Sequence, residues 1–383
     1  MTVPSVDIFC RVVDNFGDMG VCWRLARRLG LDHGWKVRLW IDDLPSFQRL
    51  APGIDPAQPS QDLDGIALRN WPASAPDPID FRCHDLVIEA FACDPPAWFV
   101  QAMRSRRPAP LWINLEYLSA EPWIEGCHGL PSMRNDGLKK HFFFPGWTTA
   151  TGGLLREPQR LATVARAQAS EANRIESLHA IGLAPLGHAL SEGHTRLVSV
   201  FCYPQAPIAD LLHAISRHWR TDRTWICLAG HTRPDLGQSC PANVHINHLP
   251  MLSHDHYDVL LQSCDLNVVR GEDSLVRAIW AARPFLWHIY PQDEQAHLAK
   301  LDAWLVRSTL PASVHTLQRA FNMPDDAQNG APDTVLQVSA AQALGRDWSA
   351  WEDAVQHDCA ALATQADLAD NIVAFFTMHA ISR

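Results

Sequence analysis

The sequence predicts an α/β protein built from two facing Rossmann-like domains. Its 383 residues exceed what one hydrophobic core usually organises, which favours two domains of roughly 150 to 200 residues each. Short apolar runs alternate with helix-compatible segments in both halves, as parallel sheets covered by helices require. Each half also contains a glycine-bearing turn between an apolar run and an amphipathic segment, at residues 14–20 and 268–274.

The apolar runs are short, and we interpret them as buried parallel strands. In the first half they occupy residues 6–10, 85–89 and 111–115, and in the second half residues 197–202, 224–228, 265–269 and 284–289. In open sheets of this kind, ligands bind beyond the carboxyl ends of the strands. We therefore look for chemistry at those edges, on either side of a cleft between the domains.

The boundary between the halves is predicted from composition. Residues 158–182 are polar and alanine-rich, typical of a helix, and the glycine- and proline-containing segment 183–195 is interpreted as a linker. This division assigns residues 1–182 to the first domain and 196–360 to the second. The last segment, 361–383, has a helical apolar pattern from 368 to 378 that could pack on either domain.

Composition excludes several classes of protein. The net charge of −10 argues against non-specific nucleic-acid binding, which depends on Lys and Arg clusters. The first residues do not resemble a signal peptide, and no apolar stretch reaches the ~18–20 residues of a membrane span. Ten cysteines without a CxxC pair indicate reduced thiols in a cytosolic protein. The pairs His245/His248 and His254/His256 lack ligand-like companions, so no metal site is expected.

The first glycine-bearing turn has the sequence DNFGDMG, residues 14–20. It precedes a segment with one apolar helical face, formed by Val21, Cys22, Leu25 and Leu29, and Gly30 suits the end of that helix. Asp14 and Asp18 are therefore expected at a strand-to-helix turn that faces the cleft. A structural interpretation is also open, in which Asp18 caps the helix and Asp14 makes a local turn.

The second turn follows another apolar run, with the sequence RGEDS at residues 270–274. Asp273 or Ser274 could cap the helix that follows, and the free N–H groups of a helix N-terminus suit a diphosphate. Because carboxylates repel phosphate, Glu272 and Asp273 are better acceptors for sugar hydroxyls or backbone N–H groups, and Arg270 could balance their charge. The alternative is an ion-paired turn with a helix cap.

Aromatic residues occur close to the predicted edge of the second sheet. Phe201 and Tyr203 end its first strand, and Tyr257 follows the loop 254–256. Rings at such positions can stack on a nucleobase, although ordinary packing is the commoner role of a buried ring.

Together these segments resemble the elongation factor P arginine rhamnosyltransferase family, EarP. The likeness is densest in DNFGDMGVCWRLAR (14–27) and CDLNVVRGEDSLVRAIWAARPFLWHIYPQDEQAH (264–297). The resemblance implies a glycosyltransferase B fold and a cytoplasmic, inverting enzyme that needs no metal or other cofactor. Its donor would be dTDP-β-L-rhamnose and its acceptor an arginine of elongation factor P, in support of the translation of polyproline stretches. The first domain would then receive the acceptor and the second the nucleotide sugar.

The resemblance also implies roles for individual residues. It makes Asp18 the catalytic carboxylate, with Asp14 as a second essential one, and it assigns Asn15, Phe16 and Gly17 between them to substrate binding. The residues that it assigns to the donor are Phe201, Tyr203, His254, Tyr257, Arg270, Glu272, Asp273 and Ser274. His254 replaces a glutamine expected to contact the thymine, and Tyr257 stands where phenylalanine is usual.

The chemistry of the acceptor limits what Asp18 can do. A guanidinium keeps its proton up to a pKa of about 12.5 and an aspartate titrates near ~3.9, so complete prior deprotonation would cost roughly 12 kcal/mol. We expect the carboxylate to bind and orient the guanidinium and to take the proton as the new N–C bond forms. On the donor side, a helix N-terminus would stabilise the departing diphosphate.

Two other functions stay open at this point. The N-x-G-D loop is also compatible with another sugar-nucleotide-dependent transferase or a polysaccharide pyruvyl transferase, although the RGEDS segment argues against the latter. A non-catalytic module that binds elongation factor P is a function of a different class. A donor-turnover assay distinguishes it from an enzyme.

Overall fold

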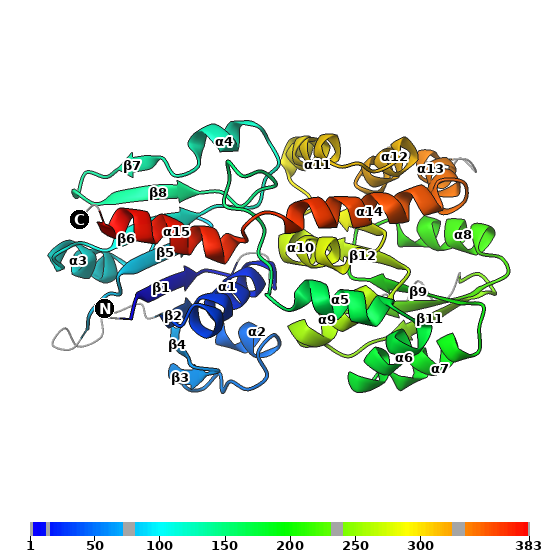
Figure 1. Ribbon diagram of the computed structural model, residues 1–383, viewed down its shortest axis with the longest axis horizontal. Coiled ribbons are helices and arrows are strands. Elements are labelled where there is room, and N and C mark those ends of the chain that lie inside the picture. The colour runs from blue at the N-terminus through cyan, green and yellow to red at the C-terminus, as the bar shows by residue number, and fades with distance from the viewer. Residues whose placement is uncertain (1–2, 13–15, 72–80, 231–239, 324–333, 382–383) are drawn as a thin grey trace. The chain divides into compact units, whose positions relative to one another are not determined.

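The computed structural model describes residues 3–12, 16–71, 81–230, 240–323 and 334–381. The chain forms two compact units, one of residues Met1–Glu157 and Gln365–Arg383 and the other of Pro158–Thr364. In Figure 1 the first unit runs from blue to cyan and includes the red C-terminal helix, and the second runs from green to orange. Each unit has its own sheet.

The strands of the first unit are β1 (Ser5–Cys10), β2 (Lys36–Ile41), β3 (Ser60–Leu63), β4 (Ile66–Asn70), β5 (Leu86–Ala90), β6 (Leu111–Leu115), β7 (Pro131–Met133) and β8 (Lys139–Phe143). Its helices are α1 (Gly17–Arg27), the π-helical turn η1 (Arg28–Asp32), α2 (Leu44–Gln48), α3 (Ala97–Ser105), α4 (Trp123–Cys127) and α15 (Leu368–Ile381).

The strands of the second unit are β9 (Thr195–Val200), β10 (Arg223–Leu228), β11 (Val244–His248), β12 (Leu266–Arg270) and β13 (Phe285–His288). Its helices are α5 (Arg160–Gln168), α6 (Glu171–Ala180), α7 (Ala184–Ser191), α8 (Ile208–His218), α9 (His254–Ser263), α10 (Gly271–Ala281), the 3₁₀ turn η3 (Asp293–Gln295), α11 (Ala296–Arg307), α12 (Ala312–Phe321), α13 (Val335–Leu344) and α14 (Trp348–Ala363). All the apolar runs interpreted as strands are confirmed, with ends that differ by a few residues.

The first sheet has the strand order β3-β4-β2-β1-β5-β6-β8-β7 and is parallel except at its two edge strands. The chain moves from β1 outward to β2 and β4, and then returns to β5 on the other side of β1. The direction of winding therefore reverses between β1 and β5. Such a topological switch point is where open α/β sheets bind ligands, beyond the carboxyl ends of the strands.

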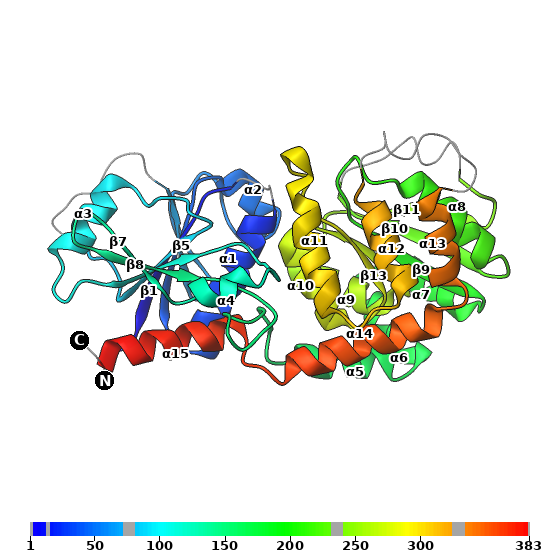
Figure 2. The same ribbon diagram turned by 90° about the horizontal axis from the view of Figure 1, so that it is seen from above.

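Alternation along β1 builds a different core on each face of this sheet. Ile8 belongs to the apolar cluster that includes residues of α1 and α15, whereas Phe9 belongs to the cluster that includes Phe99 of α3. Successive side chains of a strand point to opposite faces. The sheet is therefore covered on both sides, and Figure 2 shows α15 and α3 on opposite sides of it.

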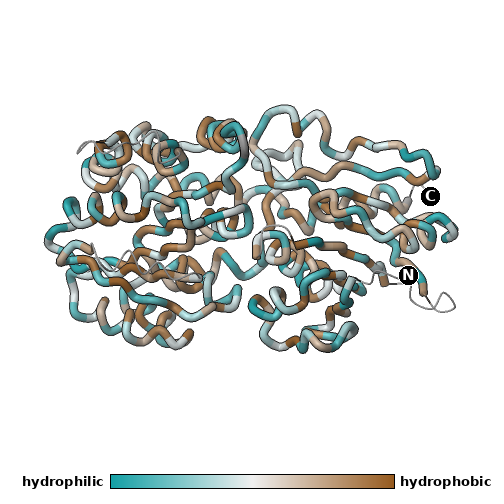
Figure 3. Tube along the Cα trace, turned by 180° about the vertical axis from the view of Figure 1, so that it is seen from behind, coloured by the Kyte–Doolittle hydropathy of each residue, from teal (hydrophilic) through white to brown (hydrophobic). Residues whose placement is uncertain are grey.

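The second sheet is wholly parallel, with the order β11-β10-β9-β12-β13. Its winding reverses between β9 and β12, which makes a second switch point. The helices of this unit form two groups. In the first, α13 packs against both α8 and α12, and in the second, α5, α9 and α10 all pack against one another. Figure 2 shows these groups on the two sides of the sheet. Figure 3 shows apolar residues concentrated along the strands of both units.

The predicted domain boundary, a linker at residues 183–195, is wrong. The segment 158–182 forms two helices, because Ser170 caps the start of α6 by accepting a hydrogen bond from the Asn173 N–H at 3.1 Å. The supposed linker contains α7, where Pro185 lies in the first turn, a position that needs no N–H donor. The chain instead leaves the first unit after Glu157 and re-enters it at Gln365.

The C-terminal helix α15 packs on the first unit. Leu368 and Ile372 are buried in the cluster that also contains the α1 side chains. A buried ion pair joins Arg28 Nη2 to Asp367 Oδ2 at 2.8 Å, and the Trp35 and Phe376 rings meet edge to face at 4.9 Å. The contacts settle the packing that the sequence left open.

Gly30 does not end the first helix as predicted. It lies inside the η1 turn, and a Cβ atom there would be 2.5 Å from Ile66 Cδ1, so the need for glycine is close packing. The residue with left-handed backbone is Gly34, at φ +69°. Across the described ranges, no helix is long and apolar enough to cross a membrane.

Candidate functional site

Asp18 lies in the first turn of α1, just beyond the carboxyl end of β1. The residue that caps this helix is Phe16, without a side-chain hydrogen bond, so the interpretation of Asp18 as the helix cap is wrong. Asp18 is 3% exposed. Asp18 also acts on Cys10, the last residue of β1. The pKa of the Cys10 thiol is raised by a hydrogen bond with Cys22, by burial and by neighbouring carboxylates, one of which is Asp18. Asp18 is thus placed close to the last residue of β1, at the edge where ligands bind.

The rest of the predicted acceptor loop is described only in part. Asp14 and Asn15 lie outside the described residues. Phe16 packs against the apolar cluster of the first unit, and Gly17 opens α1. The helix N-terminus favours a carboxylate in its first turn by the charge of the helix dipole. Asp18 is therefore compatible with this position as an ionised group.

The RGEDS segment joins β12 to α10 through a sharp turn. Gly271 has φ +61°, a left-handed conformation that costs glycine little. The prediction that Asp273 or Ser274 caps the helix is wrong, because the cap residue is Arg270, again without a side-chain hydrogen bond. The first N–H groups of any α-helix have no acceptor within that helix. In α10 these are the N–H groups of residues 270–273. A helix N-terminus of this kind is a common binding site for anions.

The carboxylates of this segment are ion-paired. Glu272 contacts Lys300 Nζ, and Asp273 Oδ2 accepts a hydrogen bond from Arg277 Nε at 2.7 Å. Arg277 also reaches Asp258 Oδ1 at 2.9 Å and is 2% exposed. The ion pairs of the alternative interpretation are therefore confirmed, but the helix cap that it included is not. It leaves open a role for Glu272 and Asp273 toward a sugar.

Arg270 has a different neighbourhood from the one predicted. Its guanidinium lies over the Phe201 ring at 4.3 Å and over the Tyr203 ring at 4.9 Å. The Tyr257 ring meets Phe201 edge to face at 5.9 Å, and the Tyr290 ring meets Tyr203 at 5.5 Å. We call these five residues the aromatic cluster. The aromatic cluster gathers residues from the segments that follow β9 and β13, the last residue of β12 and one residue from the first turn of α9.

Exposure separates the members of the aromatic cluster. Tyr203 and Tyr257 are only 7% and 8% exposed, whereas Tyr290 is 50% exposed. Burial raises the pKa of Tyr257, because the phenolate would lose its hydration, and the nearby Ser274 and Arg277 partly offset the shift. Tyr290 was missed by the sequence analysis. The signal that could have found it is its place two residues beyond β13, at the same carboxyl edge as Arg270.

Two histidines border the aromatic cluster. His288 Nδ1 accepts a hydrogen bond from the Tyr203 N–H at 3.2 Å. Burial, together with His297 and Arg270, lowers the pKa of His288 to about 4, so the ring is a neutral acceptor at pH 7. His254 is the first residue of α9, which Ser253 caps by accepting a hydrogen bond from the His256 N–H at 3.3 Å. The predicted donor residues are thus brought together at one edge of the second sheet.

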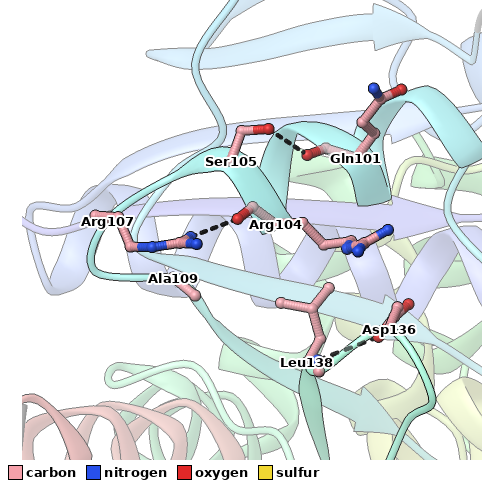
Figure 4. Close-up of a pocket in the computed structure, with 8 residues that line it drawn as sticks. Gln101, Arg104, Ser105, Arg107, Ala109, Asp136 and Leu138 are labelled. Carbon is pink, nitrogen blue, oxygen red and sulfur yellow. Dashed lines mark hydrogen bonds between the residues drawn. The ribbon is translucent and has the colours of Figure 1, made fainter.

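A hollow of about 650 Å³ lies elsewhere in the first unit (Figure 4). Its lining residues are Gln101, Arg104, Ser105, Arg107, Ala109, Asp136, Gly137 and Leu138. They come from the end of α3 and from the segments that precede β6 and β8, so the hollow lies at the amino edge of the sheet. The carboxyl edge, where Asp18 lies, is the edge at which such sheets bind substrates.

Metal ligands do not gather in the part of the chain that the structure describes. Among those residues, His, Cys, Asp and Glu side chains form no group of three or more that could hold a metal ion. The positive groups on this edge of the second sheet include the α10 N-terminus and the Arg270 guanidinium.

Relatives cover nearly the whole chain. The family model described as Elongation-Factor P (EF-P) rhamnosyltransferase EarP matches residues 6–377. Proteins named protein-arginine rhamnosyltransferase from Pseudomonas putida and Pseudomonas aeruginosa are each 42% identical to the chain, over 97% and 98% of it and over 98% and 99% of their own lengths. A protein of the same name from Neisseria meningitidis is 34% identical over 97% of each chain.

Solved structures agree in fold. A structure that describes EarP-mediated arginine glycosylation of translation elongation factor EF-P has a TM-score of 0.61 at 28% identity, over 97% of this chain and 98% of that chain. A trehalose 6-phosphate synthase from Burkholderia multivorans has a TM-score of 0.53 at 10% identity, over 100% of each chain, which shows the fold alone. The two Rossmann-like units have the glycosyltransferase B architecture, and the chain belongs to the elongation factor P rhamnosyltransferase family, EarP.

Proposed function

We propose that this protein transfers L-rhamnose from dTDP-β-L-rhamnose to an arginine side chain of elongation factor P, with inversion at the sugar and without a metal. The observation that carries the donor half is the α10 N-terminus beside the aromatic cluster. There, the first N–H groups of a helix, a guanidinium and two aromatic rings lie at one sheet edge. The family membership supports the acceptor half. The reaction is cytoplasmic and supports the translation of polyproline stretches.

Each part of the donor has a partner in the second unit. The diphosphate binds the α10 amides and Arg270, which also neutralise the charge that grows on the leaving group. The thymine lies against the exposed side of the aromatic cluster, with His254 beside it at the start of α9. The paired carboxylates Glu272 and Asp273 accept hydrogen bonds from sugar hydroxyls. The positive charges of their ion-pair partners, Lys300 and Arg277, offset the repulsion between these carboxylates and the diphosphate.

Asp18 serves the acceptor. Its carboxylate binds the guanidinium, turns one nitrogen toward the sugar C1 and accepts the proton as the N–C bond forms. A nearly buried position strengthens this hydrogen bond, because little water competes for the carboxylate. Asp14 holds the other edge of the guanidinium, and residues 15–17 line the same acceptor site.

The direct test is the intact mass of elongation factor P after incubation with the protein and dTDP-β-L-rhamnose. The proposal predicts the gain of one deoxyhexose. The matched reaction uses dTDP-glucose, and a gain of hexose instead of deoxyhexose would support another sugar-nucleotide-dependent transferase. Binding of elongation factor P without consumption of either donor would support the non-catalytic module.

A further inference from the structure

A strained turn follows β5 in the first unit. Phe91, Ala92 and Asp94 all have positive φ, at +57°, +53° and +50°. Non-glycine residues rarely adopt this conformation, and it persists only where surrounding contacts impose it. The Phe91 N–H donates to the Leu115 carbonyl at 2.7 Å and the Ala92 N–H to Asn114 Oδ1 at 3.0 Å. The end of β6 thus holds the turn in place.

The strained turn supports an exposed aromatic ring. Tyr117 stacks on Phe91 with ring centroids 4.4 Å apart and planes 16° apart. Phe91 in turn packs against the apolar core of the unit. Tyr117 nevertheless stays 40% exposed. A rigid ring with solvent on part of its surface is a binding platform for a planar cation, because the ring face attracts positive charge.

The register of the sheet brings the ends of β1 and β6 close together. Phe9 pairs with Glu89, and Ala90 pairs with Leu115, so β1, β5 and β6 end at one level. Neighbouring strands lie about 4.8 Å apart, which puts the end of β6 about 10 Å from the end of β1. Asp18 follows β1, and Tyr117 follows β6. The switch point between β1 and β5 lies between them.

A carboxylate accompanies the ring. Glu116 is half-buried, its N–H donates to the Phe143 carbonyl at 2.9 Å, and its side chain accepts a hydrogen bond from Asn114. Burial and the nearby Glu89 raise the pKa of Glu116, although Lys140 opposes the shift. An arriving cation would stabilise its ionised form.

We propose that Tyr117 and Glu116 position the acceptor arginine: the guanidinium side chain lies along the Tyr117 ring and donates a hydrogen bond to Glu116, with a reactive nitrogen directed to Asp18. This inference rests on the proposed function, whose acceptor is a guanidinium. The planar shape of that group suits both partners, since guanidinium stacks on aromatic faces and forms directed hydrogen bonds to carboxylates. Tyr117 and Glu116 are substrate-positioning residues, and the proton transfer belongs to Asp18.

The test compares Tyr117→Ala, Tyr117→Phe and Glu116→Gln with two control variants. Leu31→Ala removes an exposed apolar side chain at the amino edge of the sheet, and Asp62→Asn neutralises an exposed carboxylate on edge strand β3. For each variant, kcat and KM for elongation factor P, KM for the donor and the melting temperature are measured.

We expect Tyr117→Ala to raise the KM for elongation factor P about 3- to 30-fold, the effect of one cation–π contact. Glu116→Gln should raise it about tenfold or more, as expected for the loss of a charged hydrogen-bond acceptor. Tyr117→Phe should stay close to wild type because the ring is kept. Donor KM and melting temperature should not change, and the controls should match wild type.

Three results would overturn the inference. Wild-type acceptor KM in both Tyr117→Ala and Glu116→Gln would show that neither group touches the arginine. A parallel rise of donor KM with a fall in melting temperature would show a purely structural role. A wild-type enzyme that does not modify elongation factor P would instead overturn the proposed function, and this inference with it, and that failure is visible before any variant is made.

Discussion

Replacing Arg277 should destabilise the second unit strongly, because this side chain is buried between two carboxylates. Arg277 Nε lies 2.7 Å from Asp273 and Arg277 Nη1 lies 2.9 Å from Asp258, and the arginine is 2% exposed. In Arg277→Met the nearly buried Asp273 would lose this cation, and Asp258 would keep the more distant Arg160, whose Nη1 lies 3.7 Å from Asp258 Oδ2. Breaking a buried ion pair typically costs about 3–5 kcal/mol. For a unit of roughly 200 residues that corresponds to a fall of about 6–20 °C in melting temperature.

Differential scanning calorimetry of the full chain measures this effect. The matched control is Arg319→Met, which breaks the exposed pair with Asp302, 2.6 Å long, and should cost less than about 1 kcal/mol. A double variant that adds only Asp273→Asn should recover part of the loss, since the carboxylate beside the missing guanidinium is then neutral. Equal melting temperatures for Arg277→Met and Arg319→Met would refute this account of the network.

The remaining predictions concern the two half-sites. Asp18→Asn should abolish transfer and leave dTDP binding near wild type by calorimetry; loss of dTDP affinity would assign Asp18 to the donor. Tyr203→Ala and Tyr257→Ala should weaken donor binding by about 1–3 kcal/mol, the range of base stacking on aromatic rings, and unchanged affinity in both would move the base elsewhere. Gly271→Ala should impose about 1–2 kcal/mol of strain from its left-handed backbone and raise the KM for the donor. EDTA treatment should leave transfer intact, and a loss of activity that Mg²⁺ restores would contradict the metal-free mechanism. The pKa of His288 is about 4 in the folded protein and ~6.5 in the unfolded chain. Its contribution to stability should therefore be complete above about pH 6.5 and decline below that pH. His288→Gln should flatten this decline in urea titrations at several pH values, and an unchanged slope would contradict the prediction.

The strands could be predicted from the sequence because buried parallel strands are continuous apolar runs between turn residues. β1 and β12 show this pattern, and the glycine turns beyond them locate the carboxyl edges. The edges then indicated the candidate residues Asp18 and Arg270. The prediction of the strands succeeded because local pattern and tertiary position coincide there, whereas the roles of Asp18 and Arg270 stay predictions.

The domain boundary could not be predicted, because it depends on contacts and not on local composition. Pro185 is as compatible with the first turn of a helix as with a linker, and packing decides between them. The same limit applies to α15, whose apolar pattern shows a buried face without identifying its partner. Contacts between residues far apart in the sequence determine both the domain boundary and the packing of α15.

The side-chain partners within the site were also beyond the sequence. Arg270 was expected to balance acidic neighbours, but it lies over two rings, because the segment after β9 is brought beside β12 only in the folded sheet. Tyr290 and Tyr117 escaped notice for the same reason. Each follows a strand whose place in the sheet order cannot be read from the sequence.

The most direct test of arginine rhamnosylation is tandem mass spectrometry of elongation factor P treated with dTDP-β-L-rhamnose and either the wild-type protein or Asp18→Asn. The account predicts a deoxyhexose on the side chain of one arginine with wild type and unmodified peptide with the variant. A deoxyhexose on a serine, threonine or asparagine, or equal modification of the arginine by Asp18→Asn, would contradict it.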